Sequence, residues 1–595
     1  MLRSPLHGPA LPAIGLITLA MAAGAVLIRD PYYQLILSTV PIWALVGLTW
    51  NLFSGYSGLI SFGHSTFFGL GAFAVALLAI KLGISPWLGL WVATFVGGLA
   101  ALIIGRITFG LRGHYFALAM LAYPSLFIFL FDWMGWQELT FPIRRDEPWL
   151  FMQFPDGRII TLMGVAMMAA VMLITLLVER SRFGLSMLSI KQNEMAAEAA
   201  GINTFRIKML GFVLSGALGG LAGGFHAVVL QVVTPHGVLG TVVSAQALIL
   251  TLFGGIGTLF GPVIGAVVLV PLTEALRAQL GHILPGIQGV IYGLTIMLVI
   301  LLAPEGVYWK VRDLLARRRA AQGPSLAAEP ARAAIGESAQ AAPRTPRPKG
   351  ELILQVSELS KNFGGLKAVQ KVSFEVHRGE ILGIIGPNGA GKTTLFNLLN
   401  GFTPVSGGQV HLFGRPVTGL KPNALCRLGL GRTFQVARPF ARMSLLDNVV
   451  VGAIARSASG EQALEMARQA LAMVGLAHRA DAVVSGLTNL ELRLLELARA
   501  LACQPQLLLL DETLAGLGAV EVEEVLRVIQ RLPEAGVTVV IIEHTMQAML
   551  RLADRFLVLD HGQVIAQGLP AQVMADPAVV KAYLGKKWMD LNAQA

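Results

Sequence analysis

The clearest chemical signal in the sequence is a glycine-rich run at residues 386–394, GPNGAGKTT. It follows the apolar run ILGIIG at 381–386 and fits the pattern G-x-x-x-x-G-K-[S/T] of loops that bind nucleotide phosphates. Glycines let backbone N–H groups turn towards phosphate oxygens, and the helix that follows adds the positive end of its dipole. We expect Lys392 to reach the β- and γ-phosphates of ATP, and Thr393 to bind Mg²⁺.

Two acidic residues end a second apolar run, LLLLDE at 507–512. Asp511 suits the magnesium shell, and Glu512 suits the base that polarises the water attacking the γ-phosphate. A third apolar run, VTVVIIEH at 537–544, ends in a histidine. From Glu351 onward such strand-like runs alternate with helical runs, which predicts an α/β domain with a largely parallel sheet.

The first half of the chain has a different composition. Residues 1–305 hold 25 of the 81 charged residues, and hydrophobic residues make up 54% of the whole chain. A single soluble globule and a disordered chain are therefore excluded, and a polytopic membrane domain of about ten helices is predicted. The candidate spans are 11–28, 34–53, 58–80, 84–105, 113–131, 159–178, 209–230, 241–257, 260–278 and 287–303.

Basic residues indicate the orientation of these spans. Clusters lie at 106–112, 180–191 and 310–319, and ten spans with both ends inside place all three on the cytoplasmic side. The net charge of +11 fits contact with anionic membrane lipids. Because no basic face carries aromatic stacking residues, a nucleic-acid partner is not expected. Glycine pairs such as Gly219–Gly220 and Gly223–Gly224 favour close helix packing, with broken helices lining a solute path as the alternative.

The run NLFSGYSGLISFGHSTFFGLGAF at 51–73 resembles the permease signature of branched-chain amino acid importers of the ABC superfamily. Three further stretches resemble the same family, at 181–203, 254–266 and 301–309. The resemblance implies a coupling helix that docks on an ATPase, within the polar loop 179–208 that holds Glu194 and Glu198. The alternative is a solvated cytoplasmic helix. We expect His64 to be a helix-end histidine bound to a backbone carbonyl, with a proton relay as the alternative.

Residues 351–587 resemble the ATPase of ABC transporters, and the runs at 432–453 and 576–585 resemble the branched-chain amino acid branch. The resemblance implies that Phe363 stacks on adenine and that Gln435 links Mg²⁺ and the attacking water to the permease. It also implies that His544 contacts the γ-phosphate, which completes a catalytic set of Glu512, His544, Gln435 and Lys392. The implied ATP ligands are Phe363, Gly386, Pro387, Asn388, Gly389, Ala390, Gly391, Lys392, Thr393, Thr394 and Thr488; those of Mg²⁺ are Thr393, Gln435 and Asp511.

The sequence departs from the family pattern at the signature, which usually reads like LSGGQ. Counting back from ARAL at 498–501 gives LTNLE, in which Thr488 keeps a hydroxyl but Asn489 and Leu490 replace two glycines. Glycine allows close backbone approach to phosphate, and a leucine side chain hinders it. Nearby, Thr513 and Gly518 replace the usual proline and the usual acid or amide. Since two such ATPases pair head to tail in the family, we expect an asymmetric pair in which the site built on Lys392 is the better hydrolase.

These observations predict a permease at 1–310, a cytoplasmic linker at 311–350, an ATPase at 351–587 and a tail at 588–595. The linker is rich in Ala, Pro, Arg and Ser, a composition that cannot bury enough surface to fold. Cys426 and Cys503 have neither disulfide nor metal-ligand spacing, and we expect both to be buried small hydrophobes.

The predicted function is a fused subunit in a bacterial inner membrane that couples ATP hydrolysis to uptake of a branched-chain amino acid or a related solute. The family implies a second permease, a second ATPase and an extracytoplasmic solute-binding protein as partners. The alternatives are a family importer of urea, amides or aromatic acids, and a regulatory subunit with an impaired ATPase site. An exporter half, a non-hydrolysing membrane scaffold and a soluble NTPase with a membrane anchor are the remaining rivals, and they fit the span pattern or the intact ATPase motifs less well.

Overall fold

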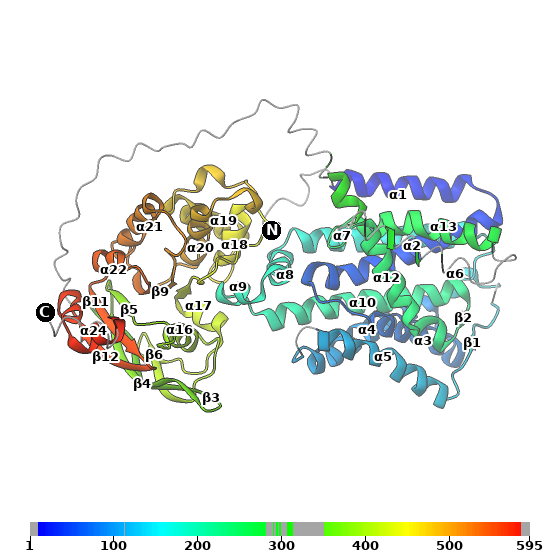
Figure 1. Ribbon diagram of the computed structural model, residues 1–595. Coiled ribbons are helices and arrows are strands. Elements are labelled where there is room, and N and C mark those ends of the chain that lie inside the picture. Colours follow the sequence, from blue (N-terminus) through cyan, green and yellow to red (C-terminus); the bar gives the residue numbers. More distant parts are fainter. Residues whose placement is uncertain are drawn as a thin grey trace, which may run out of the picture. The chain divides into compact units, whose positions relative to one another are not determined.

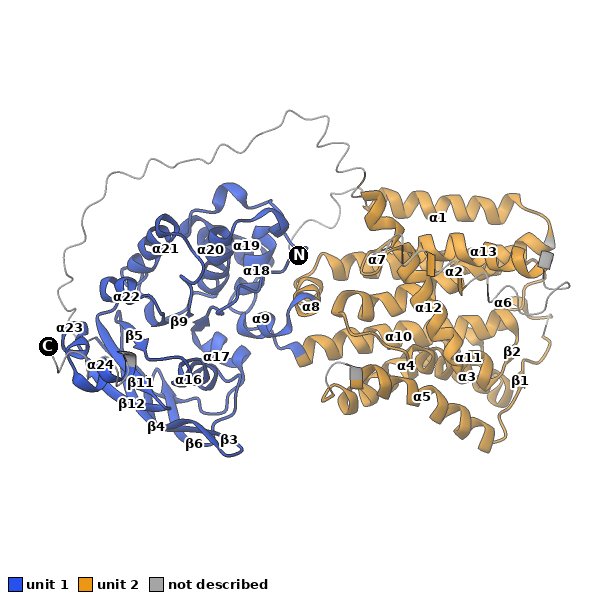
Figure 2. Ribbon diagram, in the orientation of Figure 1, with its two compact units in different colours: residues 1–2, 192–204, 332–595 blue, residues 3–191, 205–331 orange. Residues whose placement is uncertain are grey.

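The computed structural model describes residues 10–111, 114–144, 146–280, parts of 290–314, and 350–584. The chain forms two compact units, coloured separately in Figure 2. The helical unit comprises residues 3–191 and 205–331. The α/β unit comprises residues 332–595 and also takes in the short internal segment 192–204, along with residues 1–2.

Nine helical segments among the described residues are long and apolar enough to cross a membrane. They follow the first nine predicted spans in order (Figure 1), and the predicted span 287–303 lies largely outside the described residues. The segments are formed by α1 Ala10–Leu27, α2 Pro31–Trp50 with the π-helical turn Asn51–Gly55, α3 His64–Leu82, α4 Pro86–Thr108, α5 His114–Trp133, α7 Gly157–Glu179, α10 Thr204–Leu230, α11 Pro235–Leu239 with α12 Thr241–Gly254, and α13 Gly261–Leu280. Shorter elements of this part of the chain are β1 Leu139–Thr140, α6 Pro148–Phe151, α8 Arg182–Gln192 and β2 Val232–Val233.

Glycines bring the backbones of α3, α4 and α10 into contact. A Cβ added at Gly223 would lie 1.8 Å from the carbonyl oxygen of Phe68, and one at Gly220 would lie 2.2 Å from that of Ala93. Such approaches are possible only without a side chain, and small residues are the usual means of tight helix packing in lipid. The packing interpretation of these glycines therefore fits the structure.

The third span begins later than the sequence predicted, because residues 58–63 are not helical. Gly58 has φ +78°, and the Trp50 indole N–H donates to the Ser61 carbonyl oxygen at 2.7 Å. His64 begins α3, as expected of a helix-end histidine. However, its Nε2 lies 3.0 Å from the Thr49 hydroxyl, so the polar partner that the structure shows is a side chain and not the predicted backbone carbonyl.

The α/β unit is built on a six-stranded sheet of order β12-β11-β5-β10-β9-β8, in which β11, β5, β10, β9 and β8 run parallel. A second, four-stranded sheet is antiparallel and has the order β4-β3-β6-β7. The first sheet consists of β5 Ile381–Ile385, β8 Leu430–Arg432, β9 Leu507–Asp511, β10 Thr538–Ile542, β11 Arg555–Asp560 and β12 Gln563–Gly568. The second consists of β3 Leu352–Phe363, β4 Leu366–His377, β6 Gly407–Leu412 and β7 Arg415–Pro416.

Helices complete this unit (Figure 1). Strands β5, β9 and β10 are buried along their whole length, which explains their continuous apolar sequences. Their carboxyl ends carry the predicted site. The helices are α9 Glu194–Ala199, α16 Lys392–Leu399, α17 Pro422–Leu428, α18 Leu445–Ala453, α19 Gly460–Met473, α20 Asn489–Leu501, α21 Ala519–Arg531, α22 Met546–Leu552, α23 Pro570–Met574 and α24 Pro577–Leu584.

Candidate functional site

The glycine-rich loop connects β5 to α16 and takes the shape that phosphate binding requires. Gly389 and Gly391 have φ +83° and +97°, a region that favours glycine. A Cβ at Gly391 would also lie 2.4 Å from the Ala368 carbonyl oxygen. Lys392 is the first residue of α16, and its ammonium donates to the carbonyl oxygens of Gly386 at 2.6 Å and Pro387 at 2.9 Å. The lysine is thus held against the loop, with the N-terminus of α16 beside it.

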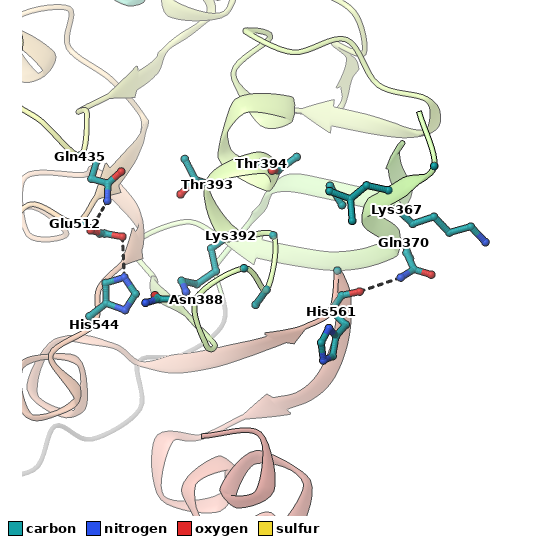
Figure 3. A pocket seen from close by; sticks show the side chains of 17 residues that line it. Lys367, Gln370, Asn388, Lys392, Thr393, Thr394, Gln435, Glu512, His544 and His561 are labelled. Atoms are coloured by element: carbon teal, nitrogen blue, oxygen red, sulfur yellow. Dashed lines mark hydrogen bonds and ion pairs between the residues drawn. The ribbon is translucent and has the colours of Figure 1, made fainter. Parts of the chain in front are cut away.

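Glu512 lies between two of the predicted catalytic side chains (Figure 3). The Gln435 amide donates to its Oε2 at 2.7 Å, and the His544 Nε2 lies 2.8 Å from its Oε1. Glu512 has φ +46°, a strained conformation for a non-glycine residue, and such strain is concentrated at functional sites. Three predicted site residues from distant parts of the sequence therefore meet in the structure, while their catalytic roles stay predictions.

Asp511 is buried at the end of β9, with its two carboxylate oxygens in different situations. Oδ2 accepts a hydrogen bond from Arg432 at 3.2 Å, whereas Oδ1 is buried and has no hydrogen-bond partner among the described residues. The Asp511 backbone N–H donates to the Thr433 hydroxyl, which fixes the end of the strand. A buried oxygen left without a donor fits a site for a hard cation, which prefers oxygen ligands. Asp511 and Thr393 are accordingly suited to hold Mg²⁺.

One cavity joins most of these residues (Figure 3). It is lined by Gly365, Leu366, Lys367, Ala368, Gln370, residues 388–394, Gln435, Glu512, His544, His561 and Gly562. Gly386, Pro387 and Asp511 are not among its lining residues, although the carbonyl oxygens of Gly386 and Pro387 accept hydrogen bonds from Lys392. Phe363 does not line it: its side chain is half-exposed at the end of β3, with the Lys361 ammonium 4.9 Å from the ring centroid. The predicted adenine contact of Phe363 therefore stays a prediction.

Burial shifts several pKa values in and around this site. It lowers the pKa of Lys392, an effect that the nearby Glu512 and Asp511 oppose. It raises the pKa of Asp511 against the attraction of Arg432. Burial, with the nearby Glu512 charge, raises the pKa of Glu543 to about 7, although the Leu514 backbone N–H donates to this carboxyl at 2.7 Å.

Helix α20 holds the backbone around Gln435 through three buried side chains on one face. Arg493 donates to the Gln435 carbonyl oxygen at 2.7 Å, and the Phe434 N–H donates to Glu496 at 3.2 Å. Arg499 donates to the Arg438 carbonyl oxygen at 2.7 Å. The segment that carries Gln435 is thus fixed by a helix whose other end bears the altered signature.

The altered signature forms the N-terminus of α20. Thr488 is the N-cap, and its hydroxyl accepts the Glu491 backbone N–H in a capping box. Asn489 donates to the Gly516 carbonyl oxygen at 3.0 Å. Thr488 lies outside the cavity that holds Lys392, as expected if it serves a partner's nucleotide.

Helix α9, from the polar loop predicted to couple the domains, packs within the α/β unit (Figure 2). Ala196 and Ala197 are buried, and the Arg442 backbone N–H donates to the Gln192 side chain at 3.0 Å. Glu198 accepts a hydrogen bond from Thr204, and Glu194 is exposed in the first turn. The docked helix excludes the alternative of a freely solvated one.

The two cysteines lie on the side of the α/β unit where α9 packs. Cys426 and Cys503 are both buried and free, as predicted. Cys503 lines a small cavity together with Ala196 and Ala200 of the α9 region. A Cβ at Gly201 would lie 3.0 Å from the Cys426 sulfur.

Sequence reasoning missed several residues of the site. Lys367, Gln370 and His561 line the cavity, and no sequence motif marks them. Arg432 lies within the run GRTFQ, but only its bond to Asp511 reveals its place in the site. A basic residue three positions before Gln435 was the available signal.

The α/β unit has a phosphate-binding loop and a buried pair of acids, and the same chain carries a set of membrane-capable helices. Together these features define a transport ATPase that carries its own membrane domain. Family comparisons agree. The model for "Branched-chain amino acid transport system / permease component" matches residues 32–301. The models for "ABC transporter" and "Branched-chain amino acid ATP-binding cassette transporter" match residues 369–515 and 563–587.

Similar proteins come from bacteria and archaea. A probable branched-chain amino acid transport ATP-binding protein of Archaeoglobus fulgidus is 37% identical over 245 residues, which cover 39% of this chain and 95% of the relative. A high-affinity branched-chain amino acid transport ATP-binding protein of Salmonella typhimurium is 37% identical over 250 residues, covering 39% and 98%. A solved nucleotide-free ATP-binding cassette matches with 31% identity and a TM-score of 0.37, covering 40% of this chain and 100% of the other.

The chain belongs to the family of branched-chain amino acid ABC transporters, and it joins the permease and the ATPase in one polypeptide. It is a multi-pass membrane protein whose C-terminal unit is an ABC ATPase, coupling ATP hydrolysis to transport.

Proposed function

We propose that this chain takes up a branched-chain amino acid, or a closely related solute, across a bacterial inner membrane, with its α/β unit in the cytoplasm. The observation that carries the proposal is the position of Glu512, which Gln435 and His544 contact at 2.7 and 2.8 Å beside Lys392. The altered signature favours a regulatory subunit, but this intact catalytic set favours hydrolysis.

The proposed chemistry is transfer of the γ-phosphoryl group to water. The Glu512 carboxylate polarises the water, and the Gln435 amide and the His544 imidazole fix the orientation of that carboxylate. Lys392 and the N–H groups of residues 388–394 bind the phosphate oxygens as negative charge develops on them. Thr393 and Asp511 are suited to hold Mg²⁺, which neutralises phosphate charge when bound.

The proposed route of coupling is α9. Phosphoryl transfer can drive transport only if the α/β unit and the membrane helices exchange force, and α9 lies in the chain between α8 and the membrane-capable helix α10. Its buried alanines and the hydrogen bond from Arg442 to Gln192 hold it within the α/β unit. We propose a second permease, a second ATPase and an extracytoplasmic binding protein as the remaining partners.

Proteoliposomes that contain the full complex and its binding protein provide the test. Uptake of radiolabelled leucine is measured with wild-type protein, with Lys392→Ala and with Glu512→Gln. We expect ATP-dependent uptake that both substitutions abolish, whereas Arg551→Gln, at an exposed ion pair with Glu523, leaves uptake unchanged. Uptake of urea, an amide or an aromatic acid in place of leucine would change the substrate class, and uptake that survives Lys392→Ala would refute the proposed mechanism.

A further inference from the structure

Arg432, the last residue of β8, is a buried cation held in one orientation. Its side chain is 4% exposed. One terminal nitrogen donates to Asp511 at 3.2 Å, and the other donates to Asn397 at 2.7 Å and Asn400 at 3.1 Å. A guanidinium bound at both ends cannot rotate without breaking several bonds, so it fixes the rotation of the Asp511 carboxylate. Because Arg432 occupies Oδ2, the buried Oδ1 is the oxygen left for a cation.

The same side chain lies where α9 packs. Arg432 lines a small cavity together with Ala196, Ala199 and Ala200, all from the α9 region of the same compact unit. The aromatic ring of Phe434 lines it too, and lies 5.3 Å from the guanidinium carbon of Arg432. One residue therefore contacts both the surface on which α9 packs and the carboxylate suited to magnesium.

The packing of the α9 region against the rest of the α/β unit is tight at the second residue after the helix. Gly201 has φ +87°, and a Cβ there would lie 2.4 Å from the Cβ of Ala455. Alanine side chains leave no polar group on the face of α9 that lines the cavity. Seated, α9 covers this side of Arg432 with alanine side chains and keeps water away, which strengthens the attraction of Arg432 to Asp511. Displaced, α9 would admit water and weaken that attraction.

We propose that Arg432 is a positioning residue that makes magnesium binding at Asp511 depend on the seating of α9. The inference rests on the proposed function, since it takes Asp511 as a magnesium ligand and α9 as the coupling element. Linkage is reciprocal, so a seated α9 favours magnesium binding and bound magnesium favours the seated α9. A movement of the membrane helices that displaces α9 would thereby loosen magnesium and nucleotide together.

The test measures magnesium-dependent nucleotide binding in the intact complex. The partner ATPase carries an alanine at its own P-loop lysine, so that binding reports on this chain. A fluorescent, non-hydrolysable ATP analogue is titrated with Mg²⁺ for wild type, Arg432→Gln and Arg432→Lys. We expect Arg432→Gln to raise the half-saturating Mg²⁺ concentration by about tenfold or more, the usual effect of losing a residue that orients a metal ligand. Arg432→Lys keeps the charge and should restore part of the affinity, while binding in EDTA is the same for all three.

A second substitution displaces α9 without touching the nucleotide site. Gly201→Val should raise the half-saturating Mg²⁺ concentration in the wild-type background and leave it unchanged in the Arg432→Gln background, because the link is already broken. Arg555→Lys, at an arginine of the same sheet that pairs with Glu380 and not with Asp511, is the matched control and should alter Mg²⁺ dependence little.

The outcomes separate this inference from the proposed function. Equal Mg²⁺ dependence in wild type and Arg432→Gln would overturn the positioning role, and additive effects of Gly201→Val and Arg432→Gln would overturn the link to α9. If wild type itself bound nucleotide without any response to Mg²⁺, or if Lys392→Ala left binding intact, the proposed ATPase site would be wrong instead.

Discussion

Glu543 makes the stability of the α/β unit depend on pH in a direction opposite to that of most acidic residues. Its carboxyl is buried near the charge of Glu512, and its pKa is raised from 4.5 to about 7. Between these two pH values the folded protein keeps a proton that the unfolded chain releases. Stability due to this group is therefore complete below pH 4.5, decreases as the pH rises to about 7, and is absent above that.

The size of the effect follows from the pKa shift. A change from 4.5 to about 7 is worth about 3 kcal/mol over the whole range, at 1.36 kcal/mol per pKa unit. About 2 kcal/mol of this lies between pH 5.5 and pH 8 by the same linkage relation. Glu543→Gln keeps an oxygen that can accept the Leu514 N–H but cannot titrate, so it removes the dependence without removing the hydrogen bond.

The assay measures the free energy of unfolding of the α/β unit in urea for wild type and Glu543→Gln. The full chain is kept in detergent micelles, and the unfolded fraction is monitored by its susceptibility to proteolysis. Between pH 5.5 and pH 8, we expect the free energy of unfolding to decrease by about 2 kcal/mol more for the wild type than for the variant. All other titrating groups are common to the two proteins and cancel in the difference. Parallel pH profiles would refute the argument, because they would mean that Glu543 is ionised in the folded protein throughout.

Three further predictions concern the membrane helices, the catalytic set and the ATPase pair. Gly223→Leu should prevent packing of α3 on α10 and reduce the monodisperse yield in detergent, since a Cβ there meets the Phe68 carbonyl at 1.8 Å, whereas Gly157→Leu, with open space around it, should not. His544→Ala should lower kcat by about 10²-fold or more with little change in nucleotide affinity, measured by phosphate release and analogue binding. Glu512→Gln should reduce hydrolysis by the full complex more than the equivalent change in the partner, and equal losses would contradict the expected asymmetry.

The parts of the fold that the sequence predicted are those whose physical cause is local. Strands β5, β9 and β10 are buried along their length, so their apolar runs are continuous and their ends are marked by Lys392, Glu512 and His544. The membrane helices were likewise predictable, because a helix in lipid must be apolar over about 20 residues. Both signals can be read from a short window of sequence.

The parts that could not be predicted depend on partners far away in the chain. Asn51 binds the backbone of residues 257 and 258, more than 200 positions later, and no local pattern in NLFSG reveals this. The same is true of Arg432, whose bond to Asp511 spans 79 residues. In each case a polar side chain in a buried place had to find one specific partner, and sequence spacing carries no information about which partner the fold supplies.

The contacts of α20 explain how an altered signature and an intact catalytic set can coexist in one chain. The substitutions Asn489 and Leu490 lie in the first turn of the helix, whereas Arg493 and Arg499 hold the Gln435 segment from its later turns. If a partner ATPase binds its nucleotide against this turn, as we propose, a change there alters what that nucleotide meets without removing a bond to Gln435. The helix can therefore lose its own phosphate-binding glycines and still keep Gln435 against Glu512 at 2.7 Å. This division along a single helix is the structural basis for expecting unequal sites in the assembled transporter.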